Sequence, residues 1–178
     1  MGVHVALLRG INLGKRRLPM KDLAAMFTDA GCRDVQVYIQ SGNVVFGADR
    51  ALAARIPALI AAAIARRHGF DSPVVMRTAA EMAKIVRANP YLPEVDPDRL
   101  GVAFLADRPT AARVASLDAG RSPPDEFSVV GRDIYLHLPN GFARTKLTNA
   151  YFDSRLATIS TARNWRTVLK LLEMTGAA

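Results

Sequence analysis

Hydrophobic and polar positions in the first third of the chain follow strand and helix periods in turn. Val3–Leu8 is apolar and rich in β-prone residues, which predicts a strand. Pro19 precedes a helical pattern over residues 21–27 that Gly31 ends. Two alternating runs, residues 35–40 and 43–46, flank Ser41-Gly42 and predict a tight hairpin.

A long helical stretch and a further strand complete this first part. Residues 50–68 predict a helix, in which Pro57 either introduces a kink or marks the real start after a short turn. Residues 73–77 predict the next strand. The order β-α-β-β-α-β is that of the ferredoxin-like split βαβ fold, so we expect residues 1–77 to form one α+β subdomain.

The second part predicts a smaller β-α-β-β-α-α subdomain over residues 78–178. Its elements are a helix (78–88), a proline-rich linker (89–97), a strand (100–106), a helix (110–117), a hairpin (127–130 and 134–138) and two closing helices (145–156 and 162–174). The last helix has an apolar stripe and a neighbouring cationic face. The stripe consists of Ala162, Trp165, Val168, Leu169 and Leu172, and the face of Arg163, Arg166 and Lys170. The second part echoes the first only in part, which leaves duplication open.

The two faces of the first predicted hairpin differ in polarity. Val37, Ile39, Val44 and Phe46 share a face that we expect in the core, whereas the opposite face is unusually polar. The residues of that second face are Gln36, Tyr38, Gln40, Asn43 and Val45.

Charge is concentrated at the two ends of the chain. The formal net charge is +8; residues 1–21 hold five Lys or Arg and no acid, and residues 134–172 hold six against one Asp. A cationic surface attracts nucleic acid, nucleotides and other anionic partners. The alternative is a compositional bias, because nineteen of the twenty-four cations are Arg in an Ala-rich chain.

The single cysteine, Cys32, excludes an intramolecular disulfide and favours a reducing cytoplasm. The longest apolar run, residues 56–65, is about half the length that a membrane span needs. We therefore expect a cytoplasmic chain without a membrane partner, and its oligomeric state cannot be read from the sequence.

The loop that follows the first strand is the strongest candidate for chemistry. Residues 9–17, Arg-Gly-Ile-Asn-Leu-Gly-Lys-Arg-Arg, combine two glycines and four cations without a carboxylate. Glycines let backbone N–H groups approach an anion, and Lys and Arg supply charge and donors. The spacing differs from a Walker A loop, and Arg16 stands where Ser or Thr would bind Mg²⁺, so a nucleotide hydrolase is not favoured.

In a split βαβ fold, three segments should meet at one end: this loop, the Ser41-Gly42-Asn43 turn and the segment leaving the second helix. The polar residues gathered there are Arg9, Asn12, Lys15, Arg16, Arg17, Gln40, Ser41, Asn43, Arg66, Arg67 and His68. A second candidate is residues 144–149, whose hydroxyls and cations at a helix start suit either a phosphate or ordinary capping.

Other chemistry has less support. His4, His68 and His137 are scattered, Cys32 suits a small core residue, and residues 94–98 suit a solvated acidic linker. We expect no metal site and no cofactor, and the catalytic residues, if any, are unknown.

Four stretches resemble an uncharacterised bacterial family, domain of unknown function 1697. They are residues 6–12 (ALLRGIN), 38–46 (YIQSGNVVF), 145–149 (TKLTN) and 161–165 (TARNW). The family pattern has Ser at Thr145 and Asn at Arg166. The resemblance implies an α+β protein with a ferredoxin-like first half and no established reaction. Together with the loop, it suggests one anion site formed by Arg9, Gly10, Asn12, Gly14, Lys15, Gln40, Ser41, Asn43, Lys146, Thr148, Asn149, Arg163 and Asn164.

Three functions remain open at this point. The first is a cytoplasmic protein that binds an anionic, phosphate-bearing ligand, either a nucleotide or a short nucleic acid. The second is an enzyme acting on a phosphorylated small molecule, with Ser41 or His137 near the chemistry. The third is a noncatalytic assembly subunit for an acidic protein partner.

Overall fold

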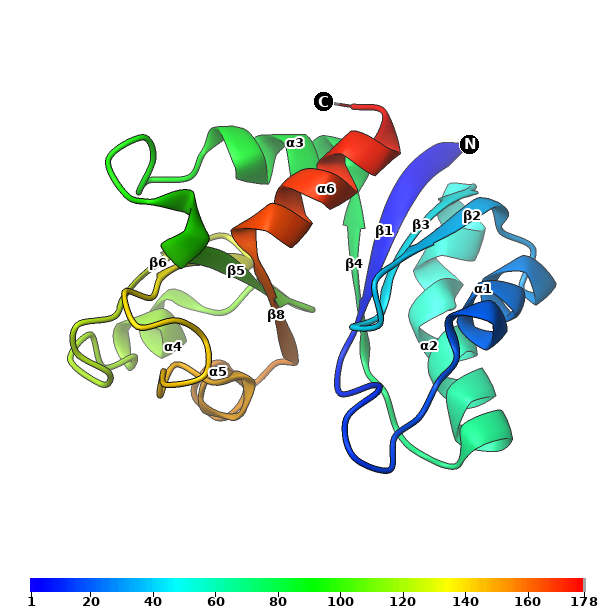
Figure 1. Cartoon of the computed structure of the whole chain (residues 1–178), viewed down its shortest axis with the longest axis horizontal. Coiled ribbons are helices and arrows are strands. Elements are labelled where there is room, and N and C mark those ends of the chain that lie inside the picture. The colour runs from blue at the N-terminus through cyan, green and yellow to red at the C-terminus, as the bar shows by residue number, and fades with distance from the viewer. Residues whose placement is uncertain (178) are drawn as a thin grey trace. The chain divides into compact units, whose positions relative to one another are not determined.

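The computed structural model describes residues 1–177 and divides into two compact units. Unit 1 comprises Met1–Ala83 and the end of the chain from Leu171 onward, and unit 2 comprises Lys84–Lys170. Each unit holds a four-stranded antiparallel sheet with helices (Figure 1). The chain is therefore an α+β protein, as predicted.

Unit 1 is built from the six elements that the sequence pattern predicts, in the same order. They are β1 (Gly2–Leu8), α1 (Met20–Asp29), β2 (Arg33–Tyr38), β3 (Asn43–Ala48), α2 (Arg50–His68) and β4 (Val74–Thr78). The sheet order is β2-β3-β1-β4, and every neighbouring pair is antiparallel. Pro57 lies inside α2, which begins after its Asp49 cap; the alternative of a helix starting at Pro57 is wrong.

The core of unit 1 lies between one face of this sheet and the two helices α1 and α2 (Figure 1). Val44 and Phe46 of β3 belong to this core, and Val37 packs against it, as the alternation predicts. The prediction that Ile39 shares this core face is wrong, because Ile39 lies in the hairpin turn with φ 47° and is 48% exposed.

Unit 2 contains one more strand than predicted. Its elements are β5 (Leu100–Leu105), α4 (Ala111–Ala115), β6 (Glu126–Val130), β7 (Asp133–His137), α5 (Asn149–Leu156) and β8 (Ser160–Asn164), with a 3-10 turn (Pro97–Arg99) before β5. The predicted closing helix over 162–174 is wrong at its start, because residues 160–164 pair with β5 as a strand. The helix α6 (Trp165–Thr175) begins after it, and the expected stripe residue Leu169 is 42% exposed.

With β8 included, unit 2 repeats the topology of unit 1. Its sheet order is β6-β7-β5-β8, which matches β2-β3-β1-β4 strand for strand. Its helices α4 and α5 pack on one face of the sheet, as α1 and α2 do in unit 1. A helix follows the last strand in each case, α3 (Ala79–Arg87) after β4 and α6 after β8. The partial echo in the sequence is thus a complete repeat of β-α-β-β-α-β-α.

Equivalent backbone hydrogen bonds occur within each unit at the end of its first strand. Leu8 N donates to Gly42 O at 2.8 Å in unit 1, and Leu105 N donates to Arg132 O at 2.9 Å in unit 2. The next residue bonds to the segment before the last strand: Arg9 N to Pro73 O, and Ala106 N to Ile159 O. These bonds fix which positions of the two units correspond.

Within residues 1–177, no helix combines the length and the hydropathy needed to span a membrane.

Candidate functional site

The loop between β1 and α1, residues 9–18, is called the cationic loop here. Gly10, Asn12 and Gly14 have left-handed backbone conformations, with φ of 71°, 54° and 57°. Arg16 N donates to Leu13 O at 3.0 Å, which closes a turn with Gly14 and Lys15 at its tip. The glycines thus allow the backbone conformations that this loop requires.

Asn12 holds the cationic loop in place through its side chain. Its Nδ2 donates to Leu18 O (3.0 Å) and to Gln40 O (2.8 Å), and its Oδ1 accepts from Leu18 N (2.9 Å). Both amide donors are therefore used within the protein. Asn12 shapes the loop and ties it to the β2–β3 turn, which contains Gln40.

The β2–β3 turn packs directly against this loop at Gly42. A Cβ placed on Gly42 would lie 2.7 Å from Ile11 Cδ1 and 2.8 Å from Leu8 Cβ, closer than carbon atoms approach. Behind the turn, the buried Asn43 donates through Nδ2 to Tyr38 O and to Ser41 Oγ. Asn43 and Ser41 thus stabilise the turn from within.

The segment between α2 and β4 meets the same loop. Ser72 is 1% exposed and donates through Oγ to Arg9 O at 2.9 Å, beside the bond from Arg9 N to Pro73 O. The three segments that topology placed at one end of unit 1 are therefore joined by hydrogen bonds. Two cations of α2 are engaged elsewhere: Arg67 pairs with Asp29 at 3.2 Å, and His68 lies 3.6 Å from Asp22.

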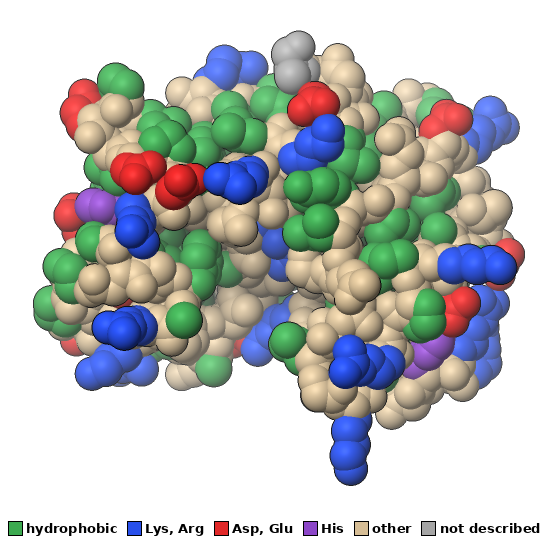
Figure 2. Space-filling view, in the orientation of Figure 1, with side chains coloured by type: hydrophobic (Ala, Val, Ile, Leu, Met, Phe, Trp, Pro, Cys, Tyr) green, Lys and Arg blue, Asp and Glu red, His purple; other side chains and the backbone are tan. Residues whose placement is uncertain are grey.

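Three consecutive cations of the loop, Lys15, Arg16 and Arg17, are exposed. Within residues 1–177, none of them forms an ion pair, and the backbone N–H groups of Gly14 and Lys15 donate no hydrogen bond. Arg16 lies over Gly10, since a Cβ there would be 3.0 Å from Arg16 Nη1. Figure 2 shows Lys and Arg side chains projecting where Figure 1 places this loop. Exposed cations beside backbone N–H groups that donate no hydrogen bond within residues 1–177 make this loop a candidate for binding an anion.

The candidates at residues 144–149 of unit 2 are placed around the start of α5. Thr148 is the N-cap, with Oγ1 accepting from Tyr151 N at 3.2 Å. Asn149 accepts from Ser160 Oγ through its Oδ1 at 3.3 Å. Lys146 is exposed, while its backbone N–H donates to Ser122 Oγ. Helix capping therefore describes Thr148, whereas the Lys146 side chain has no hydrogen-bond or ion-pair partner among residues 1–177.

The sequence pattern placed Arg163 on the cationic face of a helix, and this prediction is wrong. Arg163 belongs to β8, is 7% exposed, and donates through Nη1 to Thr161 Oγ1 (2.8 Å) and Ala162 O (2.9 Å). Burial lowers the pKa of its guanidinium to about 10. The next residue, Asn164, caps α6 by accepting from Thr167 N at 2.9 Å.

The equivalent positions in unit 1 were missed by the sequence analysis. Arg77 faces Val5 in the sheet as Arg163 faces Val102, is 1% exposed, and donates to Met76 O at 2.7 Å. Thr78 then begins α3 by accepting from Glu81 N. In the sequence, the pairs Arg77-Thr78 and Arg163-Asn164 each place an Arg before a helix-capping residue. This repeated pair could have indicated that the two positions are equivalent.

The remaining candidates, His137 and Cys32, lie outside the cationic loop in the sequence. His137 of β7 lies 3.4 Å from Glu126, and its ring is 5.7 Å from that of Tyr91. Cys32 is buried, which raises the pKa of its thiol to about 11, so it is not poised as a nucleophile.

Fold and site together define an α+β protein made of two units of matching topology, with a cationic loop on the first. The sequence model of the family described as protein of unknown function (DUF1697) matches residues 1–135. The chain belongs to this family, as its sequence stretches suggested.

One solved structure extends the match to the whole chain. The conserved bacterial protein SP0830 from Streptococcus pneumoniae is 22% identical, with a TM-score of 0.77 over 99% of both chains. At this identity the likeness shows a shared fold. No curated protein matches the sequence.

Proposed function

We propose that the chain binds an anionic ligand carrying phosphate, either a nucleotide or a short nucleic acid, at the cationic loop. The observation that carries the proposal is the row of exposed cations, Lys15, Arg16 and Arg17, which have no ion pair within residues 1–177. Charged donors of this kind form the strongest hydrogen bonds to phosphate.

The rigidity of the loop supports the same proposal. The Asn12 side chain bonds to Leu18, at the end of the loop, and to Gln40 of the β2–β3 turn. Ser72 bonds to Arg9 at the start of the loop. A loop that is already ordered loses less conformational entropy when a ligand binds. Gly10, Gln40, Ser41 and Asn43 enter the proposal as residues that shape this surface.

The residues of unit 2, namely Lys146, Thr148, Asn149, Arg163 and Asn164, stay in the proposal as anion-binding candidates. Lys146 is the strongest of them because its side chain is exposed beside the capped start of α5. The prediction that both groups of residues serve one ligand stays a prediction, and Lys146→Ala tests it separately.

We also propose a ferredoxin-like assignment for unit 1, supported by its β-α-β-β-α-β order and by the sheet order β2-β3-β1-β4. The domain division at residues 1–77 and 78–178 stays a proposal, as does the cytoplasm as compartment. The single cysteine supports that compartment.

The test compares two triple variants that remove equal charge from unit 1. The first replaces Lys15, Arg16 and Arg17 by Ala; the control replaces the exposed Arg33, Arg50 and Arg55, which also form no ion pair within residues 1–177. Binding of labelled single-stranded RNA and DNA is followed by fluorescence anisotropy, and nucleotides are screened by thermal shift.

We expect the first variant to lose binding and the control to keep it. For a single strand, each phosphate contact contributes about 0.7 to the slope of log K against log salt, so nucleic-acid binding should weaken steeply with salt. A nearly flat salt dependence would instead favour a mononucleotide. Equal loss in both variants, or no binding by the wild type, would contradict the proposal.

An enzyme acting on a phosphorylated small molecule would use the same loop to hold the phosphate. Turnover in a panel of phosphorylated metabolites, lost in the first triple variant, would favour that alternative.

A further inference from the structure

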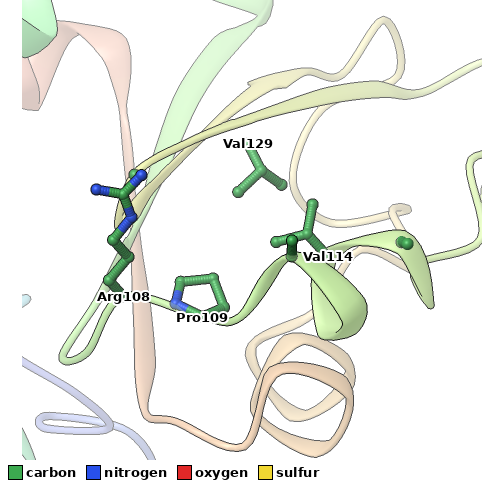
Figure 3. Close-up of a pocket in the computed structure, with 7 residues that line it drawn as sticks. Arg108, Pro109, Val114 and Val129 are labelled. Carbon is green, nitrogen blue, oxygen red and sulfur yellow. The ribbon is translucent and has the colours of Figure 1, made fainter.

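Unit 2 has an open groove beside its first helix, called the α4 groove here. Its volume is about 390 Å³. The lining residues are Arg108, Pro109, Ala111, Val114, Ala115, Val129 and Gly131. Figure 3 shows Val129 of β6 and Val114 of α4 facing the same space, with Arg108 and Pro109 on the loop that follows β5. The side chains that line the groove are thus aliphatic, apart from the cation Arg108.

The repeat of topology identifies the corresponding region of unit 1. Val129 pairs with Ile134, and Val37 pairs with Val44. Ile134 and Val44 in turn oppose Ala103 and Ala6 of the central strands. Val129 of the groove therefore corresponds to Val37, which lies in β2 just before the turn that contacts the cationic loop.

In unit 1 this region is filled by the chain itself. Ile11 and Leu18, at the two ends of the cationic loop, are 3% and 0% exposed and belong to the core. Ile11 lies against the position of Gly42, and Asn12 ties Leu18 to the turn at Gln40. Two aliphatic side chains therefore seal the space between the end of β1, the turn and the start of α1.

In unit 2 the equivalent loop is too short to fill the corresponding space. The loop from β5 to α4 spans residues 106–110, whereas the loop from β1 to α1 spans residues 9–19. The helix that follows is also shorter, Ala111–Ala115 against Met20–Asp29. The frame around the region is preserved, because Leu105 N bonds to Arg132 O as Leu8 N bonds to Gly42 O. The α4 groove is the part of the repeat that is left unfilled.

We propose that the α4 groove binds a segment of a partner protein that supplies aliphatic side chains in the places of Ile11 and Leu18 and a carboxylate to Arg108. Arg108 is exposed and forms no ion pair within residues 1–177. The neighbouring carboxylate of Asp107 accepts instead from Thr158 Oγ1 at 3.1 Å. A carboxylate on the partner would complete a charge-assisted hydrogen bond to Arg108.

The charge of the groove selects the kind of segment. The cationic loop of a second copy would bring Lys15, Arg16 and Arg17 against Arg108, and like charges disfavour that pairing. The partner segment is therefore acidic as well as aliphatic. This inference is independent of the anion site in unit 1.

The experiment uses the full chain, labelled with ¹⁵N, and a synthetic peptide as probe. The peptide copies residues 10–19 but replaces Lys15, Arg16 and Arg17 by Glu. We expect amide shifts on titration that are confined to the groove, at Ala111, Val114, Ala115, Val129 and Gly131. A second peptide, in which Ile11 and Leu18 are also replaced by Ser, should bind about tenfold more weakly.

Two protein variants examine the groove itself. Ala115→Trp places a large side chain into the groove from an exposed helix position and should weaken peptide binding about tenfold. Arg108→Glu should weaken binding of the acidic peptide and strengthen binding of the peptide with the native Lys15, Arg16 and Arg17. Arg113→Glu, on α4 but not lining the groove, is the control and should leave both affinities nearly unchanged.

The proposal is overturned if the acidic peptide causes no shifts in the groove at millimolar concentration, or if Ala115→Trp binds it as the wild type does. Shifts produced by a straight-chain fatty acid but not by the peptide would assign the groove to a lipid and equally overturn it.

Discussion

At Gly42 the β2–β3 turn packs closely against Ile11 of the cationic loop and Leu8 of β1. We expect Gly42→Ala to lower the free energy of unfolding by about 2–4 kcal/mol. Overpacking against Ile11 and Leu8 accounts for about 1–3 kcal/mol, and the φ of 85° for about 1 kcal/mol. Urea denaturation measures the difference.

The matched control is Gly69→Ala, in the same unit. Gly69 has a φ of 75°, but a Cβ there meets nothing within 4 Å. It should lose only about 1 kcal/mol, the cost of the left-handed backbone. If both variants lose the same amount, the close approach at Gly42 does not matter for stability.

Tyr135 links the stability of unit 2 to high pH. Its side chain is 1% exposed and donates to Ile85 O at 2.8 Å, and burial, with a smaller contribution from Asp133, raises its pKa to about 12. Because the folded pKa lies above the unfolded value of about 10, the stabilisation is complete below pH 10 and is lost as the pH rises towards 12.

We expect Tyr135→Phe to flatten part of the fall in stability between pH 10 and 12. The difference between the two proteins should change by about 2–3 kcal/mol over this range, which corresponds to about two pKa units. Denaturation at several pH values measures it, and tyrosinate absorbance should lose one late-titrating group. Parallel pH profiles for the two proteins would refute the assignment.

At the scale of elements, the sequence predicts unit 1 far better than unit 2. β4 begins Val74-Val75-Met76, and its apolar run marks it as a strand. β8 occupies the equivalent place but reads Ser160-Thr161-Ala162-Arg163-Asn164. Three of its polar residues, Ser160, Thr161 and Arg163, are buried, so hydrophobic periodicity carries no sign of the strand.

Some features of the candidate site follow from residue type, whereas others arise only when the sheet forms. Glycines and cations between Arg9 and Arg17 indicated an anion-binding loop, because residue type alone carries that signal. The bond from Asn12 to Gln40 joins residues 28 positions apart, and only the folded sheet brings them together. The sequence therefore marks the loop as a candidate, and its binding of an anion stays a prediction, whereas the structural role of Asn12 is visible only in the fold.

The start of α6 offers a prediction at this scale. Asn164→Ala removes the cap acceptor for Thr167 N and should cost about 1 kcal/mol of stability, whereas Asn164→Asp keeps the acceptor and the stability. Thermal denaturation compares the three proteins. If Asn164 also contacts an anionic ligand, Asn164→Asp should weaken binding of that ligand while leaving the fold intact. Equal destabilisation by Ala and Asp would show that the cap is not what Asn164 contributes.

At the scale of the whole molecule, the net charge of +8 is itself an attraction for polyanions, apart from any site. The two triple variants separate these effects, because each lowers the formal charge by three and only one of them alters the cationic loop. On a heparin column, retention by the overall field should fall to a similar extent in both.

A site-bound ligand should behave differently. A ligand at about a hundredfold excess over its Kd stabilises the protein by about 2.7 kcal/mol, and we expect this stabilisation to disappear only when Lys15, Arg16 and Arg17 are replaced. The variant lacking Arg33, Arg50 and Arg55 should elute early from heparin and still be stabilised by the ligand. If its stabilisation falls in proportion to its heparin retention, the attraction is the field of the whole molecule, and the cationic loop is not a distinct site.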